Sequence, residues 1–386
     1  MITGIVLFFF GQGPIKGFAT TLIIGIVISF LTAVFLTRMM LEWYANRKNA
    51  KEVSFTTKLT SSWLRNLNID FLGKRKIAYS VSLFFIVIAI AGLAVRGLNL
   101  GIDFSGGRNY IVQFEKPTNT EDVRKPLNNT FGDASAQVIS LGTNGDKVRI
   151  STKYRIDDNS QTVDDEITEQ LYNGLKQFLG DNTLNEFVKE NLVNTQKVGP
   201  TIADDIKVSS VWAVLISLLL VSIYIFIRFS DLGFSLGAMA SLAHDLMWIL
   251  GIYAILWGIL PFSMEIDQSF IAAILTILGF SVNDTVVVFD RVRENQTLYP
   301  KRDKKQVINE ALNETLSRTF STSMSLFVVL IAIFGFGGDT LRGFIFALIL
   351  GTILGVYSTL FVAVPVAYDL IERRNKKKAI AKNAKK

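Results

Sequence analysis

Long apolar runs separated by polar stretches dominate the pattern of this chain. Seven of these runs are long enough to cross a bilayer, which takes about 20 residues of helix. The predicted spans are residues 17–37, 77–95, 209–228, 233–257, 269–290, 318–337 and 343–366. An apolar run over residues 1–10 is too short to span and ends at Gly11-Gln12-Gly13-Pro14. The pattern therefore predicts a polytopic α-helical membrane protein.

Residues 96–207 are the one polar stretch long enough to fold outside the membrane. Its apolar residues alternate with polar ones in some segments, as in strands, and recur at helical spacing in others. The strands are predicted at 110–115, 138–141, 148–151 and before Gly199, and the helices at 123–131, 163–178 and, more weakly, 184–193. The order β-α-β-β-α-β predicts a ferredoxin-like α+β domain.

Basic residues gather between and after the apolar runs. Residues 38–76, 291–317 and 371–386 carry positive charge, and Arg228 borders the short turn 229–232. Counting the crossings places these four segments on one side of the membrane. Because short cytoplasmic loops are enriched in Lys and Arg, we expect this side, with the C-terminus, to be cytoplasmic. The α+β domain is then extracytoplasmic.

The first helix pair resembles the last. Phe10-Gly11 and Lys16-Gly17-Phe18 match Phe336-Gly337 and Arg342-Gly343-Phe344 at a constant offset. Both copies run toward the cytoplasm, so the repeat is parallel rather than inverted. Chance similarity between apolar helices is the alternative, and the shared F-G…K/R-G-F pattern disfavours it. We expect this sequence to be the C-terminal part of a longer two-half transporter, and the first pair to close a half that is mostly missing.

This reading divides the chain into six parts. They are a helix pair at 1–37, a basic cytoplasmic linker at 38–76, a first helix at 77–95, the α+β domain at 96–207, a five-helix bundle at 208–370 and a basic tail at 371–386.

Composition excludes several classes of protein. Half of the residues are hydrophobic, which is typical of membrane proteins. The net charge of +7 does not indicate nucleic acid, because the basic residues lie in the loops. With no cysteine and one histidine, no metal site or iron–sulfur cluster is expected, and we predict no cofactor. The glycine-rich segment 101–107 lacks the Gly-Lys-Ser/Thr of a phosphate-binding loop, so ATP is not expected as a direct energy source.

One predicted span carries polar groups in its interior. Asn283 and Asp284 lie within the apolar run 270–293. A carboxylate in the hydrocarbon region costs several kcal/mol unless it faces a packed or wet interior, so Asp284 indicates an ion or proton path. A permanent ion pair that holds two helices together is the alternative. Glu265 and Asp267 lie at the outer mouth of this helix, and Asp267 is predicted to cap it.

Two further polar sites lie in neighbouring spans. Arg318 is predicted near the cytoplasmic start of its helix, and Asp284 about two turns from the cytoplasmic end of its own, so the two can approach each other. A movement that separates them would change the proton occupancy of Asp284. Arg318 is alternatively a positive residue at the membrane interface. His244-Asp245 is either a proton relay or a polar contact between helices.

Several segments resemble the SecD/SecF protein-export family. GIDFSGG at 101–107 (with Gly101, Asp103, Gly106 and Gly107), VGP at 198–200 (with Gly199 and Pro200), HD at 244–245 and GFSVNDTVVVFDRVREN at 279–295 look like signatures of SecF. FGQGPIKGFATTLIIG at 10–25 resembles the last helix pair of SecD, and the order resembles fused SecDF proteins.

The resemblance implies an RND-like auxiliary subunit of the Sec machinery in the lipid of the cytoplasmic (inner) membrane. Such proteins work beside the SecYEG channel and the SecA motor, and use the proton motive force to move an outer domain that grips the preprotein. Asp284 and Arg318 match the proton-path pair of the family, and we assign Asn283, His244 and Asp245 to the same path. The missing SecD portion is an expected partner.

Three other functions are alternatives to this role. Another exporter of the same superfamily would usually have two large outer domains per half, and this chain has one. A scaffold that binds the Sec channel without transport would tolerate Asp284→Asn. An intramembrane aspartyl protease needs two carboxylates that share a proton, but Asp245 and Asp284 are predicted at different depths and the GxGD pattern is missing. We therefore expect no enzyme activity. Proton and sodium coupling both stay open, because carboxylate and hydroxyl oxygens serve either ion.

Overall fold

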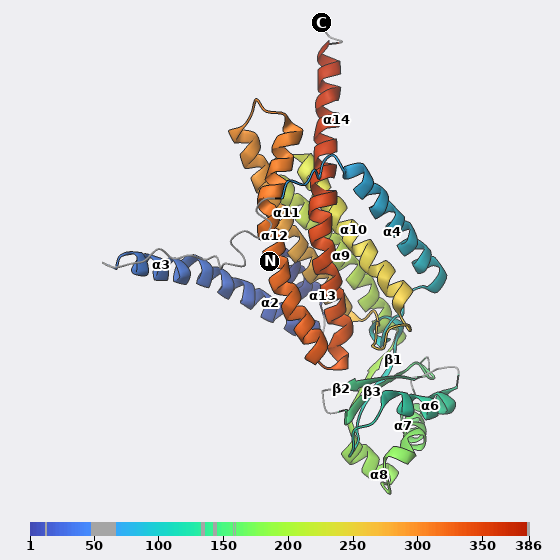
Figure 1. Ribbon diagram of the computed structural model, residues 1–386. Coiled ribbons are helices and arrows are strands. Elements are labelled where there is room, and N and C mark those ends of the chain that lie inside the picture. Colours follow the sequence, from blue (N-terminus) through green and yellow to red (C-terminus); the bar gives the residue numbers. More distant parts are fainter. Residues whose placement is uncertain are drawn as a thin grey trace.

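The computed structural model describes residues 1–11, 14–47, 67–132, 136–141, 145–156, 158 and 160–383. It consists of a bundle of long helices with a small α+β domain at one end (Figure 1). Seven helices in the described part are long and apolar enough to cross a membrane, in agreement with the seven predicted spans. The C-terminal end of the last helix projects from the end of the bundle opposite the α+β domain (Figure 1).

The bundle is built around one central helix. Its helices are α1 (Ile2–Phe10), α2 (Pro14–Leu31), α4 (Arg75–Arg96), α9 (Pro200–Phe229), α10 (Leu232–Leu256), α11 (Gln268–Leu298), α12 (Lys304–Phe336), α13 (Asp339–Ser358) and α14 (Val364–Asn383). Helix α3 (Thr37–Ala45) continues α2 and projects away from the bundle (Figure 1). Short π-helical turns, η1 (Thr32–Leu36) and η4 (Thr359–Ala363), join α2 to α3 and α13 to α14. Helix α11 contacts α1, α9, α10, α12 and α13, so it lies in the middle of the bundle.

Several helices extend well beyond the predicted spans, and α11 and α12 are the two that matter for the polar positions. Helix α11 continues to Leu298, and α12 already begins at Lys304, where the side chain of Asp303 caps it. Our placement of Asp284 and Arg318 near the cytoplasmic ends of their helices is therefore wrong, and both lie near the middle. The hydropathy pattern located the apolar part of each helix but missed the polar extensions, because a helix does not end where it leaves the membrane.

The turns of the predicted repeat match in backbone conformation, but the helices that follow them do not run parallel, because α2 lies across the bundle and α13 along it (Figure 1). Helices α1 and α12 end at Gly11 and Gly337, which have nearly the same conformation (φ −72°, ψ 144° and φ −77°, ψ 159°). Each glycine N–H bonds the carbonyl oxygen four residues earlier, at 2.8 and 2.7 Å. A Cβ atom at either position would lie 2.4 Å from that oxygen, so both turns require glycine. The matching rings of Phe18 and Phe344 contact each other edge to face, 5.8 Å apart.

The α+β domain has the predicted β-α-β-β-α-β order. Its elements are α5 (Ile102–Ser105), β1 (Gly107–Gln113), α6 (Thr120–Phe131), β2 (Gln137–Leu141), β3 (Lys147–Thr152), α7 (Gln161–Leu175), η2 (Lys176–Phe178), α8 (Leu184–Glu186), η3 (Phe187–Asn191) and β4 (Leu192–Val198). The antiparallel sheet has the strand order β2-β3-β1-β4. Side chains of the sheet, such as Val112 and Ile150, share one apolar core with Leu127 of α6 and Ile167 of α7. The ferredoxin-like prediction is confirmed.

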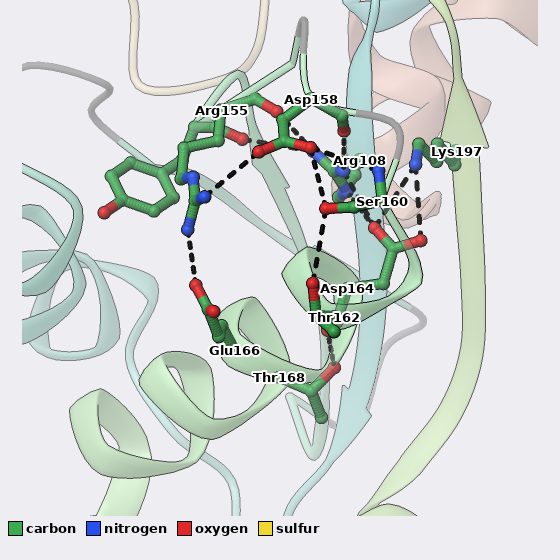
Figure 2. A network of polar contacts seen from close by, with 10 residues as sticks. Arg108, Arg155, Asp158, Ser160, Thr162, Asp164, Glu166, Thr168 and Lys197 are labelled. Atoms are coloured by element: carbon green, nitrogen blue, oxygen red, sulfur yellow. Dashed lines mark hydrogen bonds and ion pairs between the residues drawn. The ribbon is translucent and has the colours of Figure 1, made fainter.

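A buried cation fixes α7 to the sheet. The side chain of Arg108 on β1 is 3% exposed, and its guanidinium donates to Asp164 on α7 and to three backbone carbonyls (Figure 2). A buried charge is tolerated only when it is paired and hydrogen-bonded, as it is here. Burial raises the pKa of Asp164, but hydrogen bonds from Arg108 and Lys197 outweigh burial and bring the pKa below its ordinary value.

Part of the basic linker is bound to the bundle. The backbone N–H groups of Ile69 and Phe71 donate to the side-chain oxygens of Asn313 and Asn309 on α12, both at 2.8 Å. The side chains of Phe71 and Leu72 are 1% and 0% exposed. The segment before α4 is thus held at the end of the bundle far from the α+β domain, although its sequence predicted only a polar linker.

Candidate functional site

The glycine motif forms the joint between α4 and the α+β domain. Residues 101–107 make the single turn of α5 and then two residues with positive φ, +73° at Gly106 and +150° at Gly107. A Cβ atom on Gly107 would lie 2.7 Å from the side chain of Ile102 and 2.9 Å from the carbonyl oxygen of Thr152. Only glycine therefore lets strand β1 begin at this point.

The same joint is bonded to the start of α11. Gly101 donates its N–H to the carbonyl oxygen of Ile266 at 3.0 Å, and the carboxylate of Asp103 accepts from the N–H of Gln268 at 3.2 Å. Asp267 caps α11 as predicted, accepting from a backbone N–H of the first turn at 2.9 Å. The joint is thus attached to the first turn of the helix that carries Asp284.

The second motif returns the chain from the domain to the bundle. Strand β4 ends at Val198, Gly199 precedes the first turn of α9, and Pro200 begins that helix. Proline is suited to this position because the first N–H groups of a helix have no intrahelical acceptor. Val198 and Ala203 form a small buried cluster with Ile102, so the two crossings between domain and bundle pack against each other.

An ion pair also joins the domain to the outer loop of the bundle. Arg149 on β3 lies 3.6 Å from Glu265, whose side chain is 10% exposed. The pKa of Glu265 is raised to about 7, mainly by burial. The cations Arg149 and Lys153 lower it, and the carboxylates Asp267 and Asp103 add to the rise. Sequence reasoning placed Glu265 at the mouth of its helix but missed this partner, which lies on a strand more than a hundred residues earlier.

The raised pKa predicts a pH-dependent stability. The folded state holds a proton on Glu265 that the unfolded chain, with an ordinary pKa of 4.5, has already lost. Stability should therefore fall as the pH rises from 4.5 to about 7, and then level off. We expect Glu265→Gln to remove this part of the pH dependence in thermal unfolding of the purified chain. The control Glu169→Gln, on the exposed side of α7, should leave it unchanged. An unaltered slope in Glu265→Gln would contradict the assignment.

A buried carboxylate ties three helices of the bundle together. Asp245 on α10 is fully buried, and its carboxylate accepts hydrogen bonds from Ser358 at 2.7 Å and Ser281 at 3.1 Å. The Nδ1 atom of His244 lies 3.0 Å from its other oxygen, while His244 Nε2 has no partner among the described residues. The His244-Asp245 pair is thus a polar contact between α10, α11 and α13. Sequence reasoning missed Ser358, although a Ser-Thr pair inside an apolar span is an available signal.

The π-helical turn η4 begins directly after this contact. Thr359, its first residue, lies 2.9 Å from the hydroxyl of Thr285 on α11. Single π-helical turns inside α-helices occur frequently at functional sites, because they turn side chains out of the regular helical register. Here two consecutive hydroxyls at the start of the turn reach different helices, Ser358 bonding Asp245 on α10 and Thr359 bonding Thr285 on α11.

Asp284 lies on an adjacent face of α11, turned toward α12. Its carboxylate accepts a hydrogen bond from Ser323 at 3.2 Å. Arg318 is close enough for an electrostatic interaction with Asp284, but no ion pair joins them in the described part of the chain. The structure therefore brings the two residues into one region and leaves their charges unpaired. His244 and Asp245 form a separate cluster with other hydroxyls.

The surroundings of Asp284 are polar and open. A stripe of exposed or partly exposed polar residues, here called the polar stripe, follows the middle of α11 and α12. It consists of Asn283, Asp284, Arg318, Ser321, Thr322 and Ser325. Such groups are costly in contact with hydrocarbon, so the polar stripe requires water or another polar surface against it. Among the described residues no cluster of His, Asp and Glu could hold a metal ion.

Comparison with known proteins gives consistent matches over most of the chain. The family described as "Protein export membrane protein SecD/SecF, C-terminal" matches residues 181–373, and the "SecD/SecF GG Motif" matches residues 91–118. The protein translocase subunit SecF of Rhodothermus marinus is 38% identical over 316 residues, which are 82% of this chain and 97% of that protein. The protein translocase subunit SecDF of Bacillus subtilis is 32% identical over 383 residues, which are 95% of this chain and 49% of that protein.

A solved structure has the same overall arrangement. The crystal structure of SecDF, a translocon-associated membrane protein from Thermus thermophilus, superposes with a TM-score of 0.76 at 28% identity. The match covers 97% of this chain and 47% of that one. The chain is thus similar to nearly the whole of a SecF protein and to about half of a SecDF protein.

Proposed function

This chain belongs to the SecD/SecF family of protein-export membrane proteins, and on that premise we propose that it uses the proton gradient to promote preprotein export across the cytoplasmic membrane. In this role it is an auxiliary subunit of the Sec translocase, beside the SecYEG channel and the SecA motor. Relatives that carry the name of translocase subunits support the export role.

The position of Asp284 is the observation that carries the coupling. Its carboxylate lies at the middle of the central helix, bonded to the hydroxyl of Ser323 and near Arg318, with which it forms no ion pair among the described residues. A carboxylate held permanently by an ion pair would not exchange its proton, whereas this arrangement changes the proton affinity of Asp284 whenever the distance to Arg318 changes. We assign Asn283 to the same site.

The joint at the start of α11 supplies a route from proton binding to movement. A shift of α11 reaches the α+β domain through the hydrogen bonds at Gly101 and Asp103, and through the ion pair at Glu265. We place His244 and Asp245 on the same route from proton binding to movement, as a second polar site. The hydroxyl partners of Asp245 are Ser281 on α11 and Ser358, which directly precedes the turn η4. Proton uptake at the centre of the bundle would in this way move the domain that contacts the preprotein.

The polar stripe indicates where a partner lies. It crosses the membrane-spanning part of α11 and α12 and needs a polar surface against it. We propose that a SecD-like half covers it, which places Asp284 between two halves rather than against lipid. The basic end of α14, including Arg373 and Arg374, would then face the cytoplasm.

Depletion of the protein from growing cells tests the export role. We expect unprocessed preproteins to accumulate severalfold, because export loses its proton-driven step. Pulse labelling of an exported protein measures this accumulation. Collapse of the proton gradient should slow export in normal cells. In depleted cells it should slow export little further. Equal precursor levels with and without the protein would exclude the export role.

The alternatives fit the geometry less well. An intramembrane aspartyl pair would need Asp245 and Asp284 to share a proton, but the two carboxylates bond different groups. Asp245 accepts from Ser281 and Ser358, and Asp284 accepts from Ser323 on α12. A non-transporting scaffold for the Sec channel accounts for the family membership but not for a mid-helix carboxylate near Arg318. Asp284→Asn distinguishes proton-coupled export from a scaffold role. The substitution should impair proton-coupled export and leave a scaffold intact.

A further inference from the structure

A cavity of about 870 Å³ lies between the α+β domain and the outer end of the bundle. Strand β2 and the end of β3 form its wall on the domain side, together with residues of α6. The loop Trp257–Glu265, which connects α10 to α11, forms the opposite wall. None of the contacts described for Asp284 or Asp245 involves this cavity.

The domain wall of the cavity is the edge of strand β2. This strand is the last in the sheet, and within the described residues its backbone pairs only with β3, while α6 and α13 pack against it. Five consecutive residues, Ala136–Ser140, line the cavity. Successive side chains of a strand point to opposite faces of the sheet, so one face would expose only every second residue to the cavity. Because consecutive residues line it, the cavity lies along the edge of the strand. The outer edge of a terminal strand presents backbone N–H and C=O groups that can pair with another chain.

The bundle wall is attached to both the domain and the central helix. The side-chain amide of Gln137 donates to the hydroxyl of Ser263 at 3.2 Å, and Arg149 lies 3.6 Å from Glu265. Beyond Glu265 the loop continues directly into the cap of α11. A molecule that enters the cavity therefore contacts the loop that leads to Asp284.

The charge of the cavity indicates what kind of molecule fits. Its charged residues are two acids, Glu121 and Glu265, and two bases, Arg124 and Lys153. The balanced charge gives no preference for an anionic headgroup or nucleotide. A polypeptide backbone has the matching chemistry, because an extended segment can add to a free strand edge through main-chain hydrogen bonds, without requiring a particular sequence.

On the basis of the proposed export function, we propose that this cavity binds one extended segment of the exported polypeptide as an additional strand on the edge of β2. Five residues of β2 extend about 17 Å, so the segment in contact is about five residues long. Its entry displaces the loop Trp257–Glu265 and so links polypeptide binding to the position of α11.

Disulfide trapping tests this site, since the chain has no cysteine of its own. A preprotein with one cysteine in an unfolded stretch is stalled midway through export in cells that carry Ser140→Cys in the cavity wall. We expect a disulfide-linked adduct about tenfold more abundant than with the control Glu169→Cys, since docking holds the two thiols at an effective concentration of the order of mM. Glu169 lies on the exposed side of α7, away from the cavity.

The outcomes separate this proposal from the export role. Equal adducts from the two positions, or no adduct from Ser140→Cys at a normal protein level, would overturn the cavity as the binding site. In that case depletion would still cause precursors to accumulate, and the export role would stand. If depletion has no effect on precursors, the export role itself fails, whatever the pattern of adducts.

Discussion

Replacing Asp284 by Asn is expected to block proton-coupled export while the protein stays folded and in place. Asparagine keeps the size of the side chain and an oxygen that accepts the hydrogen bond from Ser323, but it binds no proton. We expect preproteins to accumulate nearly as strongly as on depletion of the whole protein. Pulse labelling measures the precursor, and immunoblotting with co-purification measures the protein level and its association with the channel.

A matched control lies on the same helix. Asp290 forms an ion pair with Arg228 at 2.8 Å, and both side chains are more than 40% exposed. Exposed ion pairs of this kind contribute only about 0–1 kcal/mol, so Asp290→Asn should leave export and protein level near normal. If Asp284→Asn cells export as well as the control, the proton-path assignment fails, and Asp284 becomes a packing residue in a scaffold.

Replacing Asp245 by Ala is expected to destabilise the bundle severely. The substitution leaves the hydroxyls of Ser281 and Ser358 and the imidazole of His244 without their buried acceptor. Each buried polar group that loses its partner costs about 1–3 kcal/mol, so a loss of about 3–5 kcal/mol is expected. Thermal unfolding in detergent measures the loss. Asp205→Ala, at an exposed position on α9, should have no comparable effect. Equal stability of the two variants would show that the polar cluster is not structural.

The variant Asp245→Asn separates the two interpretations of the His244-Asp245 pair. Asparagine still accepts hydrogen bonds from both serines, so the fold should persist. If the pair also relays protons, we expect Asp245→Asn to accumulate precursors as Asp284→Asn does. Normal export in a stably folded Asp245→Asn protein would restrict the pair to a contact between helices.

Local patterns were enough to predict most of the architecture. A run of about 20 apolar residues was enough to predict a membrane span, and alternation of apolar and polar residues was enough to predict a strand. Both patterns involve only residues close together in the sequence. The cap at Asp267 belongs to the same class, since a side chain just before a helix bonds the first turn of that helix. The ends of α11 and α12 were predicted poorly because polar helical turns outside the membrane have no hydropathy signal.

By itself, the sequence determined that this is a membrane bundle with a ferredoxin-like domain, and that Asp284 and His244-Asp245 are its unusual polar positions. Only the tertiary structure decided how these positions are used. It turned Asp284 toward Ser323, placed Ser358 against Asp245, and joined Glu265 to Arg149. The reason is physical: such contacts depend on the rotation of each helix about its axis and on the docking of segments far apart in the chain, and no local pattern contains either quantity.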